Sequence, residues 1–274
     1  MPIIMISSPP FSGGNIVAET LSKQMGYELI DDELMETSAK KYKVHVEKFK
    51  TALKRAPSLF GMSQEEILKY TAYFQATLLS TLTRDKIIYH GSVAHMMVSG
   101  VSHVLKAYIV ANINDRASRM AAAEGIDEKK ALKEIQKLDK EHKKWIKTLF
   151  NTDDSNPVLY DMVLNIGQIT VEDAAKIIQD ASENRRFQPM TYSEQCMRNL
   201  ELSSRVRAEL ITIDSNIVVR AEYADLTIQT KAVEKDKEKR ITSIREALKN
   251  FDGVKKVEIN VVEDFFGQVS TMLR

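Results

Sequence analysis

Residues 2–32, with the sequence PIIMISSPPFSGGNIVAETLSKQMGYELIDD, carry the order of elements on which the fold depends. An apolar run over residues 2–6 predicts a short strand, and residues 7–14 form a turn rich in serine, proline and glycine. Over residues 15–25, apolar side chains recur at the spacing of a helix face: Ile16, Val17, Leu21 and Met25. A strand that runs through such a turn into a helix can hold a phosphate, because consecutive backbone N–H groups and the helix dipole both favour an anion there.

Strand-like and helical segments continue to alternate beyond this unit. The expected strands cover residues 27–30, 85–89, 104–110 and 162–164, and the expected helices cover 33–42, 65–82, 114–124, 127–150 and 170–181. The run at 104–110 is almost entirely apolar, as is typical of a strand buried on both faces of a parallel sheet, and we expect 162–164 to be buried as well. The alternation predicts a doubly wound α/β domain over residues 1–182.

The composition changes after residue 182. Residues 183–192 are dominated by Glu, Asn, Arg, Gln and Pro without apolar periodicity, which predicts a linker. Beyond it, the patterns predict a helix, two strands, a helix and a strand at 193–210, 216–221, 226–230, 234–250 and 254–262. We therefore expect a small α+β module with the order αββαβ and a core of its own over residues 193–264, followed by a C-terminal tail over 265–274.

The composition of the 274 residues narrows the classes of function. Lys and Arg number 39 and Asp and Glu number 38, so the formal net charge of +1 argues against a nucleic-acid partner bound through bulk positive charge. The single cysteine, Cys196, excludes a disulfide framework and a multi-cysteine metal site, and fits a reducing compartment. No apolar run reaches the ~18 residues of a membrane span. We expect a cytoplasmic protein without a signal peptide or a transmembrane segment.

The turn at residues 12–15 is the candidate phosphate loop. Its sequence, SGGN, follows two serines at residues 7 and 8. A Walker A loop also needs a lysine for the β- and γ-phosphates and a Ser or Thr hydroxyl for Mg²⁺. Here Gly14 stands at the lysine position and Ile16 near the hydroxyl position. On the motif alone, an anion site and a tight turn that needs glycine for steric reasons both remain open.

Five segments carry a resemblance to a known family. They are ISSPPFSGGNIVAETLSKQMGYELIDDELME at 6–36, DKIIYHGSVAHM at 85–96, AYIVANINDRASRM at 107–120, KLDKEHKKWIKTLF at 137–150 and NPVLYDMVLNIGQITVEDAAKIIQDA at 156–181. Over residues 1–182 the chain resembles the cytidylate kinase-like family of P-loop nucleoside monophosphate kinases, in which a Gly-Gly loop can replace the Walker lysine. The piece LYDMVLN, followed by a helix, is the most specific match.

The kinase resemblance implies a three-layer parallel sheet with a helical LID over the phosphates. It implies transfer of the γ-phosphoryl group of ATP, with Mg²⁺, to a nucleoside monophosphate, with CMP or dCMP favoured. The implied donor-binding residues are Ser8, Ser12, Gly13, Gly14, Asn15, Ile16, Arg116, Arg119 and Gly167. The implied catalytic set is two carboxylates near the acceptor nucleotide and three LID lysines: Asp31, Asp32, Lys140, Lys143 and Lys147. The five histidines lack metal-ligand spacing, so no metal site built from side chains is expected.

The C-terminal module resembles a BON domain, named for osmotic-shock and nodulation proteins. The resemblance rests on its element order and on the turn DGVKKV at residues 252–257, before the last strand. It implies a protein or lipid ligand for the module. The sequence leaves the oligomeric state open and is compatible with an oligomer.

The sequence departs from the kinase pattern in its cations. The pair at 91–92 is Gly-Ser where the family has Gly-Arg, and residues 139–142 read Asp-Lys-Glu-His where the LID reads Asp-Lys-x-Arg. Lysine lacks the planar, bidentate grip of arginine on a phosphate, and loss of a transition-state arginine costs ~10³–10⁵ in rate in related chemistry. An alternative hypothesis is therefore a regulator that binds ATP or ADP without turnover and signals through the BON-like module. A weaker one is a scaffold whose C-terminal module does the binding.

Each group of candidates also has a purely structural explanation. The two carboxylates follow an apolar strand, where helix N-caps are common. The two arginines lie three apart on a helix and can both be solvated. The LID lysines can belong to a soluble helix stabilised by Glu–Lys pairs. The sequence alone does not choose between these readings and the functional ones.

Overall fold

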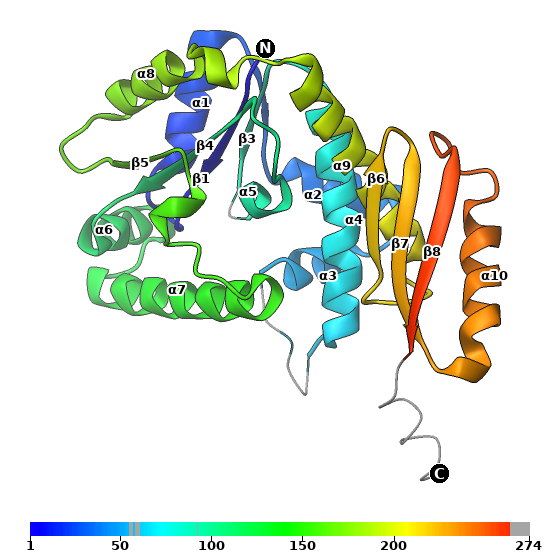
Figure 1. Ribbon diagram of the computed structural model, residues 1–274. Coiled ribbons are helices and arrows are strands. Elements are labelled where there is room, and N and C mark those ends of the chain that lie inside the picture. Colours follow the sequence, from blue (N-terminus) through cyan, green and yellow to red (C-terminus); the bar gives the residue numbers. More distant parts are fainter. Residues whose placement is uncertain (55–56, 58–60, 92, 264–274) are drawn as a thin grey trace.

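A parallel sheet at the centre of the N-terminal part sets the frame for the rest of the molecule. The computed structural model describes residues 1–54, 57, 61–91 and 93–263 (Figure 1). Five parallel strands lie in the order β2-β3-β1-β4-β5: β1 Ile3–Ser7, β2 Glu28–Ile30, β3 Ile87–His90, β4 Val104–Val110 and β5 Met162–Asn165. Because β1 is the central strand, the loop after it opens at the middle of the carboxyl edge of the sheet.

Alternate side chains of β1 enter two separate hydrophobic cores, one on each face of the sheet. Ile4 and Ile6 belong to the core formed with α1 (Gly14–Met25) and α8 (Val171–Ser182). Ile3 and Met5 belong to the core of the opposite layer, which holds α2 Glu33–Lys41, α3 Val46–Ala52, α4 Gln64–Leu82 and α5 Ala94–Met97. The expected three-layer α/β domain is confirmed (Figure 1).

The ends of several helices follow from local sequence. α4 begins at a capping box in which the Ser63 hydroxyl accepts from Glu66 N and the Glu66 carboxylate accepts from Ser63 N. Thr170 and Asp173 form the same arrangement at α8. α1 ends at Gly26, whose positive φ of 65° suits a left-handed helix end. Such signals explain why the predicted elements lie within a few residues of the observed ones.

The expected burial of strand 162–164 is wrong. In β5, Met162 and Leu164 are half-buried, whereas Val163 and Asn165 are exposed. The reason is the position of β5 at the edge of the sheet, where it pairs only with β4. An edge strand with one covered face shows this alternation.

α7 (Glu128–Phe150), which follows α6 (Ile113–Glu124), is the helix expected to form the LID. Its C-terminal half is anchored in the layer that contains α3. The Trp145 side chain is fully buried, and its indole Nε1 donates to the carbonyl oxygen of Ala52 at 2.8 Å. Ile146 is buried in the same core as Phe49 of α3. α7 is therefore held against the helices on the other side of the cleft described below.

The C-terminal part has the predicted order αββαβ. Its elements are α9 Thr191–Leu210, β6 Val218–Glu222, β7 Asp225–Ala232, α10 Lys237–Leu248 and β8 Lys256–Glu263. The sheet order is β6-β7-β8, with β6 antiparallel and β8 parallel to β7. In the expected linker, a short 3₁₀ turn (Arg185–Phe187) precedes α9, which begins two residues earlier than predicted. The expected tail, 265–274, lies outside the described residues.

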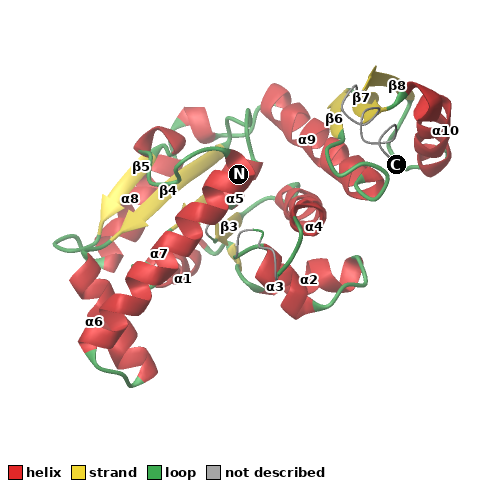
Figure 2. Cartoon of the chain, turned by 90° about the horizontal axis from the view of Figure 1, so that it is seen from below, coloured by secondary structure: helices red, strands yellow, loops and turns green. Residues whose placement is uncertain are grey.

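The expectation that this module has a core of its own is wrong. One continuous cluster of buried side chains includes Phe74 and Leu78 of α4, Val206 of α9, and Ile228 of β7. α9 lies between α4 and the three-stranded sheet, so that it contributes to both parts (Figure 2). Within the described residues, no helix has the length and apolar content needed to cross a membrane.

Candidate functional site

A cleft of about 720 Å³ lies at the carboxyl ends of β1 and β3. Its walls come from the loop after β1, the start of α2, the α3–α4 layer and α7. The carboxyl end of a parallel sheet is where α/β folds bind their ligands. The cleft brings together six of the predicted site residues: Ser8, Ser12, Gly13, Asn15, Asp31 and Asp32.

The loop after β1 presents hydrogen-bond donors that have no acceptor. Within the described part of the chain, the backbone N–H groups of Gly14, Asn15 and Ile16, at the start of α1, donate to nothing. The Ser12 hydroxyl is fully buried and also lacks a partner. A buried unpaired polar group costs about 1–3 kcal/mol and is rare in folded proteins. Donors gathered at a helix N-terminus in this way fit an anion such as phosphate.

Close packing requires glycine at two positions of the loop. A Cβ atom on Gly14 would lie 2.4 Å from Ser8 Oγ and 3.3 Å from His90 Nε2. Gly13 has a φ of 87°, and a Cβ atom there would lie 2.8 Å from Ile166 Cδ1. The steric explanation for the Gly-Gly pair therefore holds, and it is compatible with an anion site, because both depend on the same tight bend.

Arg116 and Arg119 contact the carbonyl side of the loop. Arg116 is 5% exposed; its Nε donates to Pro10 O at 2.9 Å, and its two terminal nitrogens donate to the Asp139 carboxylate at 2.9 and 2.7 Å. Arg119 donates to Phe11 O at 3.2 Å. Neither arginine is among the cleft-lining residues. The two guanidinium groups bind loop carbonyl groups, which stabilises the bend that leaves the amide groups free.

Phe11 forms part of the cleft wall and does not displace the loop from its bend. Its backbone has a φ of 62°, unusual for a residue with a side chain. The ring packs against the small cluster between α6 and α7 that contains Ala117, Met120 and Ile135. We infer that burial of this ring offsets the backbone strain.

Ile16 and Gly167, the two other predicted donor residues, are exposed. Ile16 is 48% exposed on the first turn of α1. At Gly167 a Cβ atom would meet only Asn165 Oδ1, at 3.6 Å. The neighbouring Ile166 is the residue of this turn that packs against the loop, as its distance from Gly13 shows. Whether these residues contact a nucleotide stays a prediction.

Asp31 and Asp32 lie across the cleft from the loop, at the start of α2. The Asp31 carboxylate accepts from Glu33 N at 3.2 Å, so it also supports the helix start. Asp32 makes no side-chain cap, and its carboxylate lies 4.0 Å from Lys54 Nζ. Below them the wall is apolar and aromatic, with Met35, Leu53, Phe74 and Val93. This half of the cleft can hold a flat, partly apolar group with the carboxylates at its polar end.

The end of β3 contributes two side chains that the sequence analysis did not assign to the site. Tyr89 is buried, and burial with Asp32 and Asp31 nearby raises the pKa of its phenol. His90 lies beside the loop, with Nε2 3.3 Å from Ser8 Oγ, and burial lowers its pKa. Both residues end a buried strand next to β1. Only the order of the strands in the sheet would have placed these two residues beside the loop, and apolar periodicity does not give that order.

The predicted LID lysines point away from the cleft. Leu138, Glu141 and His142 are the residues of α7 that line it. With about 100° per residue, helix geometry places positions 140, 143 and 147 on roughly the opposite side of α7. All three lysines are exposed, and Lys143 pairs with Asp153 at 2.7 Å. A contact between these lysines and a phosphate stays a prediction that this arrangement does not favour.

His142 occupies the position where the family pattern has a LID arginine. Its Nε2 lies 2.6 Å from the carboxylate of Asp154, which is largely buried. The Tyr160 hydroxyl donates to the backbone carbonyl of Asp154 at 2.8 Å and fixes that segment. The side of the cleft formed by α7 therefore carries a carboxylate-bound imidazole and a glutamate.

The cleft fits a magnesium–nucleotide complex better than a metal held by side chains alone. Among the described residues, no group of three or more His, Cys, Asp and Glu side chains could hold a metal ion. Magnesium in phosphoryl-transfer sites is bound by one or two carboxylates together with substrate phosphates. Asp31 and Asp32 supply carboxylates of that kind, and the unpaired Ser12 hydroxyl is a further oxygen that could bind the ion.

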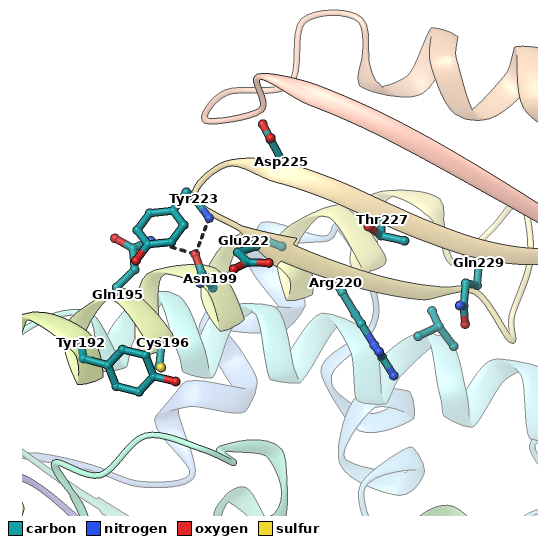
Figure 3. A pocket seen from close by; sticks show the side chains of 12 residues that line it. Tyr192, Gln195, Cys196, Asn199, Arg220, Glu222, Tyr223, Asp225, Thr227 and Gln229 are labelled. Atoms are coloured by element: carbon teal, nitrogen blue, oxygen red, sulfur yellow. Dashed lines mark hydrogen bonds between the residues drawn. The ribbon is translucent and has the colours of Figure 1, made fainter.

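A second groove, of about 520 Å³, lies between α9 and the β6–β7 hairpin. Figure 3 shows the hairpin turn with Tyr223 beside Asn199, whose side-chain oxygen accepts from Tyr223 N at 3.2 Å. Tyr192 and Cys196 line the groove from α9, and Arg220 lines it from β6. Polar and aromatic side chains thus share this surface, whereas Ile228 of β7 faces the core.

Comparison with known proteins places this geometry in a family. The sequence model of the "Cytidylate kinase-like family" matches residues 3–168, more than half of the chain. The chain belongs to the cytidylate kinase-like family. The matched range contains every residue of the cleft described above, and it ends before the C-terminal αββαβ unit.

Individual relatives agree with this membership. The cytidylate kinase of Archaeoglobus fulgidus is 26% identical over 189 residues, which cover 67% of this chain and 96% of that protein. The cytidylate kinase of Sulfolobus acidocaldarius is 25% identical over 176 residues, or 64% of this chain and 91% of that protein. A crystal structure of an uncharacterized protein from Eubacterium ventriosum superposes with a TM-score of 0.52 at 22% identity, covering 68% of this chain and all of that one. The similarity to this crystal structure supports the fold described above for the N-terminal part of the chain.

Proposed function

We propose that this member of the cytidylate kinase-like family binds ATP and transfers its γ-phosphoryl group to a nucleoside monophosphate, with CMP or dCMP the favoured acceptor. One observation carries the proposal. The unpaired amide groups and Ser12 hydroxyl of the loop stand across one cleft from Asp31 and Asp32. A donor phosphate site and a carboxylate-bearing acceptor site thus share one cavity.

The residues of the cleft would act mainly by positioning, since phosphoryl transfer asks little covalent chemistry of a protein. The loop amides would bind the donor phosphates, and Asp31 and Asp32 would orient the acceptor and contribute oxygen ligands to Mg²⁺. When bound, the ion neutralises charge on the phosphates. Met35, Leu53 and Phe74 would pack against the acceptor and exclude water.

The test is acceptor-dependent consumption of ATP by the purified full chain. With Mg²⁺, formation of ADP is measured with CMP, dCMP and each other nucleoside monophosphate in turn. We expect CMP or dCMP to give the highest rate, and D32N to lower that rate about 100-fold or more, as loss of a positioning group in an active site does. D236N serves as the matched control, because Asp236 is exposed, lies outside the cleft at the start of α10 and, like Asp32, makes no side-chain cap. A rate that no acceptor increases would refute the transfer.

A second candidate is a nucleotide-responsive regulator without turnover. It is favoured by the absence of an arginine among the cleft-lining residues that the structure describes. It is also favoured by α9, which lines the groove of Figure 3 through Tyr192 and Asn199 and packs on α4, the helix that carries Phe74 into the cleft. In this proposal the C-terminal unit is BON-like, and its protein or lipid ligand binds in that groove.

Thermal unfolding and ADP release, measured together, distinguish the two candidates. Both predict that ATP raises the melting temperature, because a ligand that binds only the folded state stabilises it. Only the kinase also releases ADP in the presence of an acceptor. Hydrogen exchange of the β6–β7 hairpin with and without ATP then tests the regulator: reduced or increased exchange supports coupling, and an unchanged pattern contradicts it.

A further inference from the structure

His90 lies beside the space in which a Walker lysine would begin, which the Ser8 side chain fills. The lysine position of the loop is Gly14, and a Cβ atom there would overlap Ser8 Oγ at 2.4 Å. His90 Nε2 lies 3.3 Å from the same Cβ position and 3.3 Å from Ser8 Oγ. A lysine at position 14 would therefore have to displace Ser8. Besides Ser8, the side chain that borders this space is the imidazole at the end of β3.

Among the residues that the structure describes, few cations line the cleft near His90. Among the described cleft-lining residues, Lys54 is the one ammonium group, and it lies beside Asp32 on the acceptor side. The two arginines nearest the loop are engaged with carbonyl groups and Asp139. Among the described cleft-lining residues on the loop side, bound polyphosphate would therefore find the loop amides, the Ser12 hydroxyl and the imidazole of His90, and no lysine or arginine.

The charged groups around His90 favour the uptake of a proton by its imidazole when an anion binds. Burial, the larger effect, lowers the pKa of His90, whereas Asp31, Asp32 and Glu19 raise it. From α7, Glu141 and His142 face the same cleft. An imidazole that is neutral beside an empty loop gains a proton when a phosphate of several negative charges binds next to it, because an opposite charge favours the protonated form.

We propose that His90 takes the part of the missing Walker lysine, by donating a ring N–H to the terminal phosphates of a nucleoside di- or triphosphate held in the loop. This inference rests on the proposed nucleotide binding and adds the group that recognises the phosphates. Ser8, hydrogen-bonded to Nε2, is the positioning residue for the ring. The consequence is a nucleotide affinity that increases as the pH falls through the pKa of the bound histidine.

The test uses calorimetric titration of the full chain with MgADP, which is not consumed. Titrations in two buffers of different ionisation enthalpy give the number of protons taken up on binding. We expect the wild type to take up protons near neutral pH and to bind more tightly at lower pH. H90Q should lower the affinity about tenfold or more at low pH, since a hydrogen bond to a charged group contributes about 1.5–3 kcal/mol. The proton uptake that remains in H90Q is the part that belongs to ADP itself.

H45Q is the matched control, because His45 is exposed and lies outside the cleft-lining set. It should bind ADP as the wild type does. If H90Q melts at a lower temperature, the test uses nuclear magnetic resonance of the histidine ring protons in the wild type. The His90 resonance is assigned by its loss in H90N. The pKa obtained from this resonance must rise when ADP is added. Equal affinity and equal proton uptake in wild type and H90Q would overturn the role of His90 while leaving nucleotide binding intact. Failure of the wild type to bind MgADP would refute the proposed function itself.

Discussion

At the scale of single residues, the tight bend of the phosphate loop depends on the missing side chain of Gly14. We predict that G14A weakens binding of MgADP at least tenfold, because the new methyl group must displace Ser8 and His90 from the loop. Calorimetric titration measures the affinity. G167A provides a comparison of stability, since its methyl group would meet only Asn165 Oδ1 at 3.6 Å. A G14A protein that binds as tightly as the wild type would contradict the close packing described for the loop.

A second residue-scale prediction concerns His95 of α5, which is 2% exposed. Its Nδ1 contacts Ser7 Oγ at 3.0 Å, Nε2 has no partner, and burial with Lys106 nearby lowers its pKa to about 4. Because this value lies below the unfolded value of about 6.5, the unfolded chain binds the proton first as the pH falls. We expect His95 to reduce the unfolding free energy by roughly 1.4 kcal/mol per pH unit between about pH 6.5 and 4.

Urea denaturation across that pH range checks the contribution of His95. The H95Q variant removes the titrating group and should give a shallower dependence of the unfolding free energy on pH than the wild type. His90 and His103 also have lowered pKa values and contribute to the slope that remains. The same slope in H95Q and wild type would mean that His95 is protonated equally in both states.

At the scale of elements, the indole of Trp145 is the largest side chain that fixes α7 to the acceptor side of the cleft. We predict that W145F costs about 1–2 kcal/mol, because the Ala52 carbonyl loses its donor, and that W145A costs about 3–5 kcal/mol, because a large cavity opens. Both variants should increase hydrogen exchange in the C-terminal half of α7. K144A, at an exposed position of the same helix, should change neither quantity. Unaltered exchange in W145A would show that α7 is held by other contacts.

The elements themselves were largely predictable from local patterns. Apolar periodicity, the Thr170 cap and the glycines after α1 and α6 are all local signals, and the helices and strands they predict are present. The orientation of α7 in the tertiary structure was not predictable in this way. Lys140, Lys143 and Lys147 form one stripe by spacing, but the side that faces the cleft is decided by the burial of Trp145 and Ile146 against α3.

The site was predictable where it is built from one continuous stretch and not where it depends on strand order. Ser12, Gly13 and Asn15 follow β1 directly, so the local pattern placed them at the end of this strand, and the family resemblance singled them out as site candidates. His90 reaches the loop because β3 pairs with β1, two segments that are more than 80 residues apart in the chain. A single sequence carries no direct signal of that pairing, which explains why the histidine at the end of β3 was passed over.

At the scale of the whole molecule, the core shared by α4 and α9 predicts one cooperative unfolding transition. The fluorescence of Trp145, the single tryptophan, reports on the N-terminal part, and hydrogen exchange of β7 reports on the C-terminal part. We expect the two probes to give equal unfolding midpoints in urea.

The variant V206A tests this coupling, because Val206 is fully buried in α9. It should lower both midpoints by the same amount, at a cost of about 1.5–3 kcal/mol for two methyl groups and the cavity they leave. V158A, at a valine that is 86% exposed, should lower neither. Two separate midpoints, or a V206A effect confined to β7, would show that the C-terminal unit folds independently, and the coupling required of a regulator would lose its structural basis.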